Sequence, residues 1–207
     1  MWPKAVFDGE GGVDIGRHVQ NRARQVIEEV MIATNGGTAR YLAAQGGVSL
    51  RRVVRSPERW LRIVAVAREL GETLPHQPDS KALEAFLAKR RRLDPLRFPD
   101  LSLVIVKLMG SGEYVVEAAG ELPVGHFGLA VHDYVHSTAP NRRFPDLIVS
   151  RLLKAALRDE AAPYSPTELG VLATHCTQQE DAARKVERRL RKSEAALLLH
   201  ALIGKHF

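Results

Sequence analysis

The sequence contains a single cysteine, Cys176, among 207 residues. One cysteine excludes an intramolecular disulfide and any zinc site built from several cysteines, and it fits a reducing compartment. The unbroken apolar runs, such as residues 195–199, are far shorter than the roughly 20 residues that a membrane-spanning helix needs. The first residues also lack the apolar stretch of a secretory signal peptide. We therefore expect a cytoplasmic protein without a membrane partner.

Several familiar catalytic signatures are absent. The sequence has no glycine-rich phosphate loop ending in Lys-Ser/Thr, no dinucleotide fingerprint and no Gly-x-Ser-x-Gly elbow. His132 and His136 stand four residues apart, but no further Cys/His cluster completes a metal site around them. Cys176 falls on an apolar helical stripe with Leu169 and Leu172, which is typical of a core residue rather than a nucleophile. We expect no metal ligands within this chain.

Basic residues exceed acidic ones, with 30 Lys and Arg against 24 Asp and Glu and a formal net charge of +6. They gather in four segments, 17–24, 89–92, 142–143 and 184–192. Any one of these segments is most simply a solvated face. Four of them in one chain favour a polyanionic partner, and nucleic acid in particular.

Apolar spacing predicts a mostly helical α+β chain with a few short strands. Gly36-Gly37 interrupts the first helical pattern at a cost of about 2 kcal/mol relative to alanine, so it either ends the helix or lets another segment approach closely. The expected helices cover residues 19–42, 57–70, 80–93, 99–109, 144–157 and 166–203, the last with a possible break near Cys176, and the expected strands cover 5–7, 13–15, 114–116 and 127–131. No regular strand–helix alternation indicates a parallel sheet, and we expect one domain.

The segment 126–146 concentrates polar side chains in a loop that Pro140 and Pro145 stiffen. Arg142 and Arg143 stand just before the predicted helix that begins near Phe144. Hydroxyl groups, guanidinium groups and exposed helix-end amides together suit a phosphodiester. A polar loop whose arginines pair with acids is the alternative, and composition alone leaves both open.

This segment resembles the signature of the ribonuclease II and ribonuclease R family, the RNB-domain exoribonucleases. That signature runs His-Phe-Gly-Leu, a short strand, Tyr, and then Ser-Pro-Ile-Arg-Arg/Lys-Tyr-x-Asp. The matching positions here are His126-Phe127-Gly128-Leu129, Tyr134, Pro140, Arg142, Arg143 and Asp146. Residues 26–42 are similar to the central helix of the family and residues 184–203 to its closing helix, in the same order.

The resemblance implies that residues 1–207 form the C-terminal part of an RNB catalytic domain. Members of this family hydrolyse single-stranded RNA from the 3′ end to nucleoside 5′-monophosphates, with magnesium as cofactor. By this resemblance Arg142, Arg143 and Glu28 are catalytic, with Arg142 on the scissile phosphate and Arg143 supporting it. The residues that the resemblance assigns to RNA binding are Glu29, His126, Tyr134, His136, Ser137, Thr138 and Asn141.

The sequence departs from the family pattern in several places. Ala139 and Asn141 replace a serine and an isoleucine, and Phe144 replaces a tyrosine. The Asp-rich metal motif and the flanking OB-fold RNA-binding domains of the family have no counterpart here. We therefore expect a partner, the N-terminal half of the catalytic domain, to supply the aspartates that hold magnesium. The alternatives are a non-catalytic RNA-binding or regulatory module of the same family, and a helical protein-interaction protein.

Overall fold

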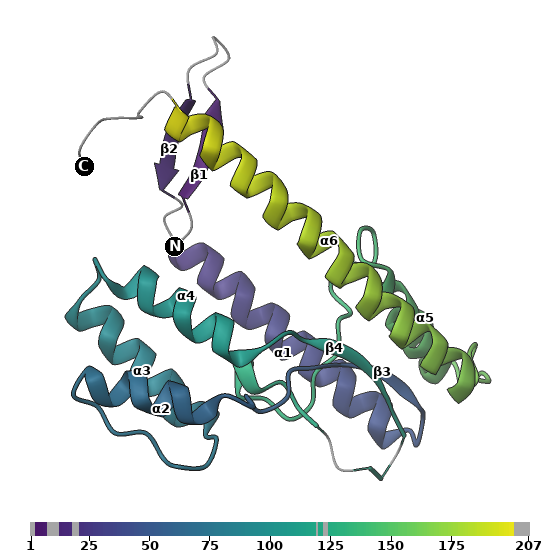
Figure 1. Ribbon diagram of the computed structural model, residues 1–207. Coiled ribbons are helices and arrows are strands. Elements are labelled where there is room, and N and C mark those ends of the chain that lie inside the picture. Colours follow the sequence, from purple (N-terminus) through teal and green to yellow (C-terminus); the bar gives the residue numbers. More distant parts are fainter. Residues whose placement is uncertain (1–2, 8–12, 18–20, 119, 122–123, 201–207) are drawn as a thin grey trace. The chain divides into compact units, whose positions relative to one another are not determined.

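The computed structural model describes residues 3–7, 13–17, 21–118, 120–121 and 124–200 (Figure 1). Within these ranges the chain forms six α-helices, one short 3-10 helix and four short strands, which confirms the mostly helical α+β prediction. The chain separates into two compact units. The smaller unit combines the residues up to Gln25 with those from Gln178 onward, and the larger unit is Val26–Thr177.

The smaller unit contains a hairpin of two strands, β1 (Pro3–Phe7) and β2 (Val13–Arg17). They pair antiparallel with Pro3 opposite Arg17, so both predicted N-terminal strands are confirmed. The same unit holds the second half of α6 (Pro166–His200). None of the helices in the described ranges has the length and apolar character needed to cross a bilayer.

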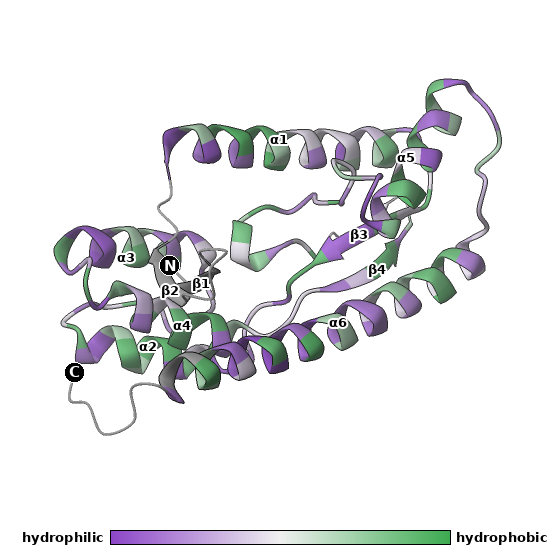
Figure 2. Cartoon of the chain, turned by 90° about the horizontal axis from the view of Figure 1, so that it is seen from above, coloured by the Kyte–Doolittle hydropathy of each residue, from purple (hydrophilic) through white to green (hydrophobic). Residues whose placement is uncertain are grey.

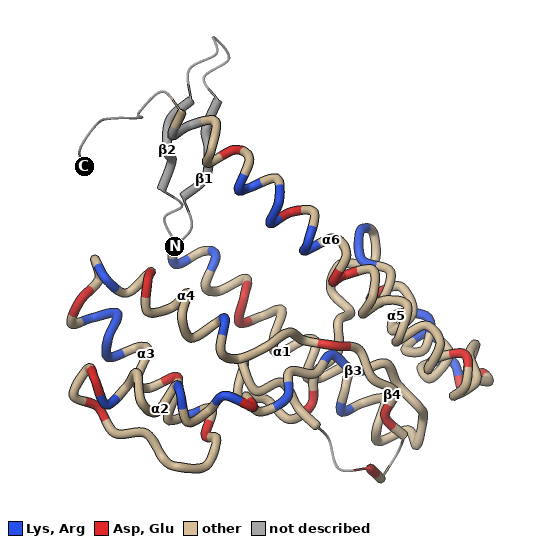
Figure 3. The backbone as a smooth tube through the Cα atoms, viewed as in Figure 1, with Lys and Arg blue, Asp and Glu red and all other residues tan. Residues whose placement is uncertain are grey.

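The long helix α6 continues without interruption past Cys176, so the possible break near that residue is not present. Its basic residues, visible as blue segments in Figure 3, are partly neutralised on the helix itself. Arg184 pairs with Glu180 and Arg191 with Glu187, each four residues apart on one face. This basic segment therefore has in part the character of an ordinary solvated helix face.

The first core of the larger unit lies between two strands and three helices. β3 (Ser49–Val53) pairs antiparallel with β4 (Glu113–Glu117), with Ser49 opposite Glu117. The end of α1 (Arg22–Ala44), α5 (Phe144–Leu157) and the start of α6 supply the remaining side chains of this core. β4 was predicted, whereas β3 was not, because two consecutive arginines obscure its apolar pattern; Figure 2 shows the contrast between purple β3 and the green middle of β4.

The second core of the larger unit joins α2 (Trp60–Glu69), α3 (Ser80–Leu93) and α4 (Phe98–Met109). All three helices were predicted, and Asp79 caps α3 by accepting a hydrogen bond from the backbone N–H of Ala82 (2.9 Å). α2 begins three residues later than expected. Pro57 starts a turn rather than the helix, since its carbonyl accepts from the Trp60 N–H (3.1 Å).

Helix α1 runs through Gly36 and Gly37 without ending. Gly36 is buried, and a Cβ placed on it would lie 3.4 Å from the backbone oxygen of Asp133. Close approach of another segment, the second alternative, is therefore correct at Gly36, whereas nothing lies within 4 Å of a Cβ added to Gly37. Nearer the N-terminus of α1, the apolar residues Val26, Ile27 and Val30 are exposed.

The strand predicted over residues 127–131 is wrong. A 3-10 helix, η1 (Phe127–Leu129), occupies that position. His126, just before η1, forms two isolated β-bridges, one to Val54 and one to Val131. Gly125 and Ala130 both have positive φ, and this left-handed backbone interrupts an extended strand. The segment that follows lies along the free edge of β3, where Arg52 N–H donates to the Tyr134 carbonyl (3.0 Å).

Candidate functional site

The turn that carries the arginine pair is anchored by one buried carboxylate. Asp146, in the first turn of α5, is 0% exposed. Its Oδ1 accepts from the backbone N–H of Ala139 (2.8 Å) and from Arg143 Nη2 (2.7 Å). The Ala139 carbonyl in turn accepts from the N–H groups of Arg142 (3.2 Å) and Arg143 (3.0 Å). These bonds fix the backbone of the whole turn against α5.

The two arginines have different environments. Arg143 is half-buried, pairs with Asp146 and approaches Thr138 Oγ1 at 3.4 Å. Arg142 is exposed, and its guanidinium makes no hydrogen bond or ion pair with any residue in the described part of the chain. A guanidinium on a fixed turn without an acid partner can bind an anionic ligand, whereas Arg143 is engaged within the protein.

Aromatic and imidazole rings pack together in the segment that precedes this turn. The rings of His126 and Tyr134 lie 5.2 Å apart between centroids, and those of Tyr134 and His136 lie 5.7 Å apart, each edge to face. The hydroxyl of Tyr114 on β4 shares a hydrogen bond with His136 Nδ1 (2.9 Å). Three residues predicted to bind RNA, His126, Tyr134 and His136, therefore form one cluster, and Tyr114 joins it from a strand.

Both histidines in this cluster are neutral near pH 7. Burial, the Arg143 guanidinium and the Arg52 guanidinium, in that order, lower the pKa of His136 to about 3. Burial and then Arg52 lower the pKa of His126 to about 4. The positive charge beside the cluster therefore resides on guanidinium groups rather than on imidazolium.

Two buried arginines of β3 belong to this region, and the sequence analysis missed them. Arg52 lies over the Tyr114 ring, with its guanidinium carbon 4.7 Å from the ring centroid. Arg51, 3% exposed, pairs through Nη2 with Glu117 Oε1 (2.8 Å). Burial raises the pKa of Glu117 against the opposing effect of Arg51. Consecutive arginines in a five-residue strand carry no local signal that both will be buried.

Asn35 of α1 is a further polar residue of the site that was not predicted. It is fully buried, and it bonds both Tyr134 and Ser137. Ser137 and Thr138 are half-buried beside it, whereas Asn141 is exposed in the turn. These predicted residues therefore line one continuous stretch of chain that leads to Arg142.

The predicted acidic residues Glu28 and Glu29 lie on the exposed N-terminal half of α1. Asn35 follows Glu28 by seven positions, which is close to two helical turns and about 10 Å along the axis. Glu28 therefore projects from the same face of α1 as Asn35, and Glu29 is rotated away by about 100°. Of these two acids, helix geometry places only Glu28 on the face of α1 that carries Asn35.

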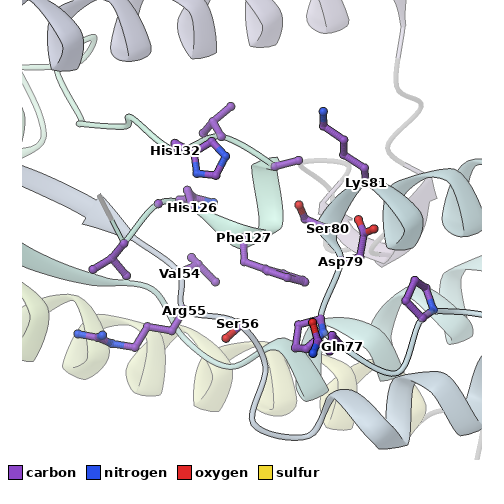
Figure 4. Close-up of a pocket in the computed structure, with 16 residues that line it drawn as sticks. Val54, Arg55, Ser56, Gln77, Asp79, Ser80, Lys81, His126, Phe127 and His132 are labelled. Carbon is purple, nitrogen blue, oxygen red and sulfur yellow. The ribbon is translucent and has the colours of Figure 1, made fainter. Parts of the chain in front are cut away.

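His126 also lines a cavity of about 650 Å³ (Figure 4). It is lined by residues of three segments, 54–56, 75–81 and 124–132. His126 and His132 form one wall, and the Phe127 ring projects between them and Gln77. His132 thus lies in this cavity wall while His136 bonds Tyr114, so the two histidines have separate surroundings.

Magnesium is the cofactor that the family resemblance implies, and it prefers several hard oxygen ligands on one surface. In the residues that the structure describes, no group of three or more His, Cys, Asp or Glu side chains lies close enough to hold a metal ion. The described residues therefore do not by themselves fit a magnesium ion.

Comparison with known proteins gives the family of the chain. The family model of the RNB domain matches residues 3–159. Ribonuclease R of Aquifex aeolicus is 32% identical over 214 residues, which cover 99% of this chain and 28% of the relative. Ribonuclease R of Escherichia coli is 29% identical over 201 residues, covering 89% of this chain and 24% of the relative. The chain thus spans about a quarter of the length of these curated relatives.

Solved structures agree on the fold. The apo form of Mycoplasma genitalium RNase R has a TM-score of 0.82 at 23% identity, covering 99% of this chain and 33% of that one. A structure of the same protein in complex with double-stranded RNA has a TM-score of 0.80. Yeast Ssd1, described as a pseudonuclease, has a TM-score of 0.68 at 24% identity over 76% of this chain and 20% of its own. The match over residues 3–159, together with this shared fold, makes the chain a member of the RNB-domain family.

Proposed function

We propose that this chain is part of an exoribonuclease that hydrolyses single-stranded RNA from its 3′ end to nucleoside 5′-monophosphates. The observation that carries the proposal is Arg142, an exposed guanidinium on a turn that the buried Asp146 holds in place. Such a group suits a phosphodiester, because a fixed cation stabilises charge that develops on the phosphate without having to reorganise. The relatives named ribonuclease R support this assignment.

In this proposal each predicted residue has a stated task. Arg142 contacts the scissile phosphate, and Arg143 keeps the turn in position through Asp146. Ser137, Thr138 and Asn141 lie along the chain that leads to Arg142, where they offer hydroxyl and amide groups to the RNA backbone. Glu28 reaches the ribose or phosphate of the terminal nucleotides from α1, and Glu29 binds RNA beside it.

The cluster of neutral rings belongs to the same segment, which leads to Arg142. His126, Tyr134 and His136 present aromatic edges and hydrogen-bonding atoms without adding charge near pH 7. The attraction of RNA to this region then depends on the guanidinium groups, whose charge does not change between pH 5 and 9.

We place the magnesium ligands in a partner segment, the N-terminal half of the catalytic domain. The length of the relatives supports this placement, because about three quarters of each lies beyond the region that this chain matches. We place the assembled enzyme in the cytoplasm, as the single cysteine favours.

A non-catalytic RNA-binding module is the second candidate. The likeness to yeast Ssd1, a protein described as a pseudonuclease, favours it because that protein shares the fold. Such a module would bind RNA through its basic groups, with an affinity that falls steeply as salt increases.

A cleavage assay separates the two candidates. A 5′-labelled single-stranded RNA is incubated with the chain in its assembled polypeptide or complex, first with magnesium and then with EDTA. Magnesium-dependent shortening from the 3′ end supports the enzyme, and a gel shift without shortening under any metal supports the module.

The variant Arg142→Ala then tests the site itself. It should abolish turnover while leaving most RNA binding intact. Arg158→Ala is the matched control, since Arg158 is also exposed but lies at the other end of α5, and it should leave turnover unchanged. Near-normal turnover in Arg142→Ala would contradict the proposed role.

A further inference from the structure

Helix α1 meets the segment that leads to Arg142 at one buried polar side chain. Asn35 Nδ2 donates to Tyr134 Oη (3.2 Å). Asn35 Oδ1 accepts from the backbone N–H of Ser137 (3.0 Å) and from Ser137 Oγ (2.8 Å). Hydrogen bonds are directional, and both the nitrogen and the oxygen of the Asn35 amide are bonded. They therefore fix α1 against residues 134–137 more strictly than an apolar contact would.

The packing around Asn35 leaves little freedom for this contact to slide. Gly36 brings the helix close to the Asp133 carbonyl, and Ala39 and Leu42 are buried in the same core as Val135. Residues 35, 36, 39 and 42 lie on one face of the helix. That face is therefore docked along residues 133–137.

The position of Arg142 depends on this docking from one side and on α5 from the other. Only Thr138 separates Ser137 from Ala139, whose carbonyl accepts from the N–H of Arg142. Asp146 holds the N–H of Ala139 from the α5 side. Asn35 holds Ser137 from the α1 side, so the turn is fixed between two helices.

We infer that Asn35 is a positioning residue, which sets the place of the Arg142 turn relative to Glu28 on the same face of α1. This inference rests on the proposed function, in which Arg142 and Glu28 both contact the 3′-terminal nucleotides. Asn35 itself is buried and does not touch RNA. Its effect should therefore fall on turnover rather than on the capture of substrate.

The test compares Asn35→Ala with two other variants in the assembled enzyme. Asn35→Ala should lower kcat by roughly 10- to 100-fold with little change in KM, because small misplacements of catalytic groups cost that much. Asn35→Asp keeps an oxygen that can accept from both donors of Ser137, and it should recover most of kcat. Leu42→Ala, at a 3% exposed position on the same helix face, should lower the melting temperature without this loss of kcat.

Amide hydrogen exchange tests the inference without any activity. The Ser137 N–H should exchange at least about tenfold faster in Asn35→Ala than in Leu42→Ala, because it loses its acceptor only in the first. Equal exchange in the two variants would overturn the positioning role even if no ribonuclease activity were found. A kcat loss equal to that of Leu42→Ala, or a loss confined to KM, would overturn it in an active enzyme.

Discussion

Asp146 Oδ1 lies 2.7 Å from Arg143 Nη2, and the side chain of Asp146 is completely buried while that of Arg143 is 27% exposed. The same oxygen also holds the N–H of Ala139, so one side chain joins the arginine pair to the first turn of α5. This interaction gives the two adjacent arginines different environments. Arg143 is engaged within the protein, whereas the Arg142 side chain is exposed to solvent.

The first prediction concerns the stability of the two arginine variants. Arg143→Ala leaves the buried carboxylate of Asp146 without its cation, which should lower the free energy of unfolding by about 3 kcal/mol. Arg142→Ala removes an exposed side chain and should change it by less than about 0.5 kcal/mol. Urea unfolding of both variants checks the difference.

A double-mutant cycle serves as the control for this prediction. Once Asp146→Ala has removed the carboxylate, the further change Arg143→Ala should cost much less than it does alone. Strict additivity of the two changes would contradict a direct interaction between them.

The second prediction concerns acid sensitivity. The pKa of His136 is about 3 in the folded chain, below its ordinary value near 6.5, so only the unfolded chain takes up this proton between those values. The stability that neutral His136 contributes is therefore fully present above pH 6.5 and is lost as the pH falls toward 3. From pH 7 to 5 this one group should lower the free energy of unfolding by about 2 kcal/mol.

His136→Gln removes this titration and still offers a hydrogen-bonding atom to Tyr114. Its free energy of unfolding should fall less than that of the original protein between pH 7 and 5, as measured by urea unfolding at each pH. Equal falls in the two proteins would show that His136 is not held neutral in the folded state.

The third prediction concerns Gly125, at the start of the segment that contains His126. Its φ is +76°, and an added Cβ would lie 3.0 Å from the Val131 oxygen. Gly125→Ala should lower the free energy of unfolding by about 1–3 kcal/mol, through both left-handed strain and this clash.

Gly46→Ala provides the matched control, measured by the same urea unfolding. Gly46 has a similar φ of +70°, but nothing lies within 4 Å of its added Cβ. It should therefore show the left-handed strain alone and cost less than Gly125→Ala. A smaller cost for Gly125→Ala would mean that the contact with Val131 is not tight.

Much of the helical structure could be predicted because its signals are local. Asp79 caps α3 in the position that the sequence suggested, and the apolar spacing of α3, α4 and α5 matches their observed extents. The order of aromatic, hydroxyl and guanidinium residues up to Asp146 also indicated the site. These features depend on residues a few positions apart, which lie near one another in any conformation of the chain.

The remaining features depend on contacts between distant segments. β3 was missed because Arg51 and Arg52 look like surface residues until Glu117 and Tyr114 cover them. The strand predicted at 127–131 gave way to η1 because the backbone is left-handed at Gly125, just before it, and at Ala130 within it.

The sequence by itself determined the helices, the order of the motif and the chemical groups that the site contains. Tertiary structure alone decided which arginine is free, which histidines stay neutral and that Asn35 joins α1 to the motif. The physical reason is that charge state and availability follow from burial. Asn35 and Ser137, 102 positions apart, become neighbours only when α1 packs against the loop.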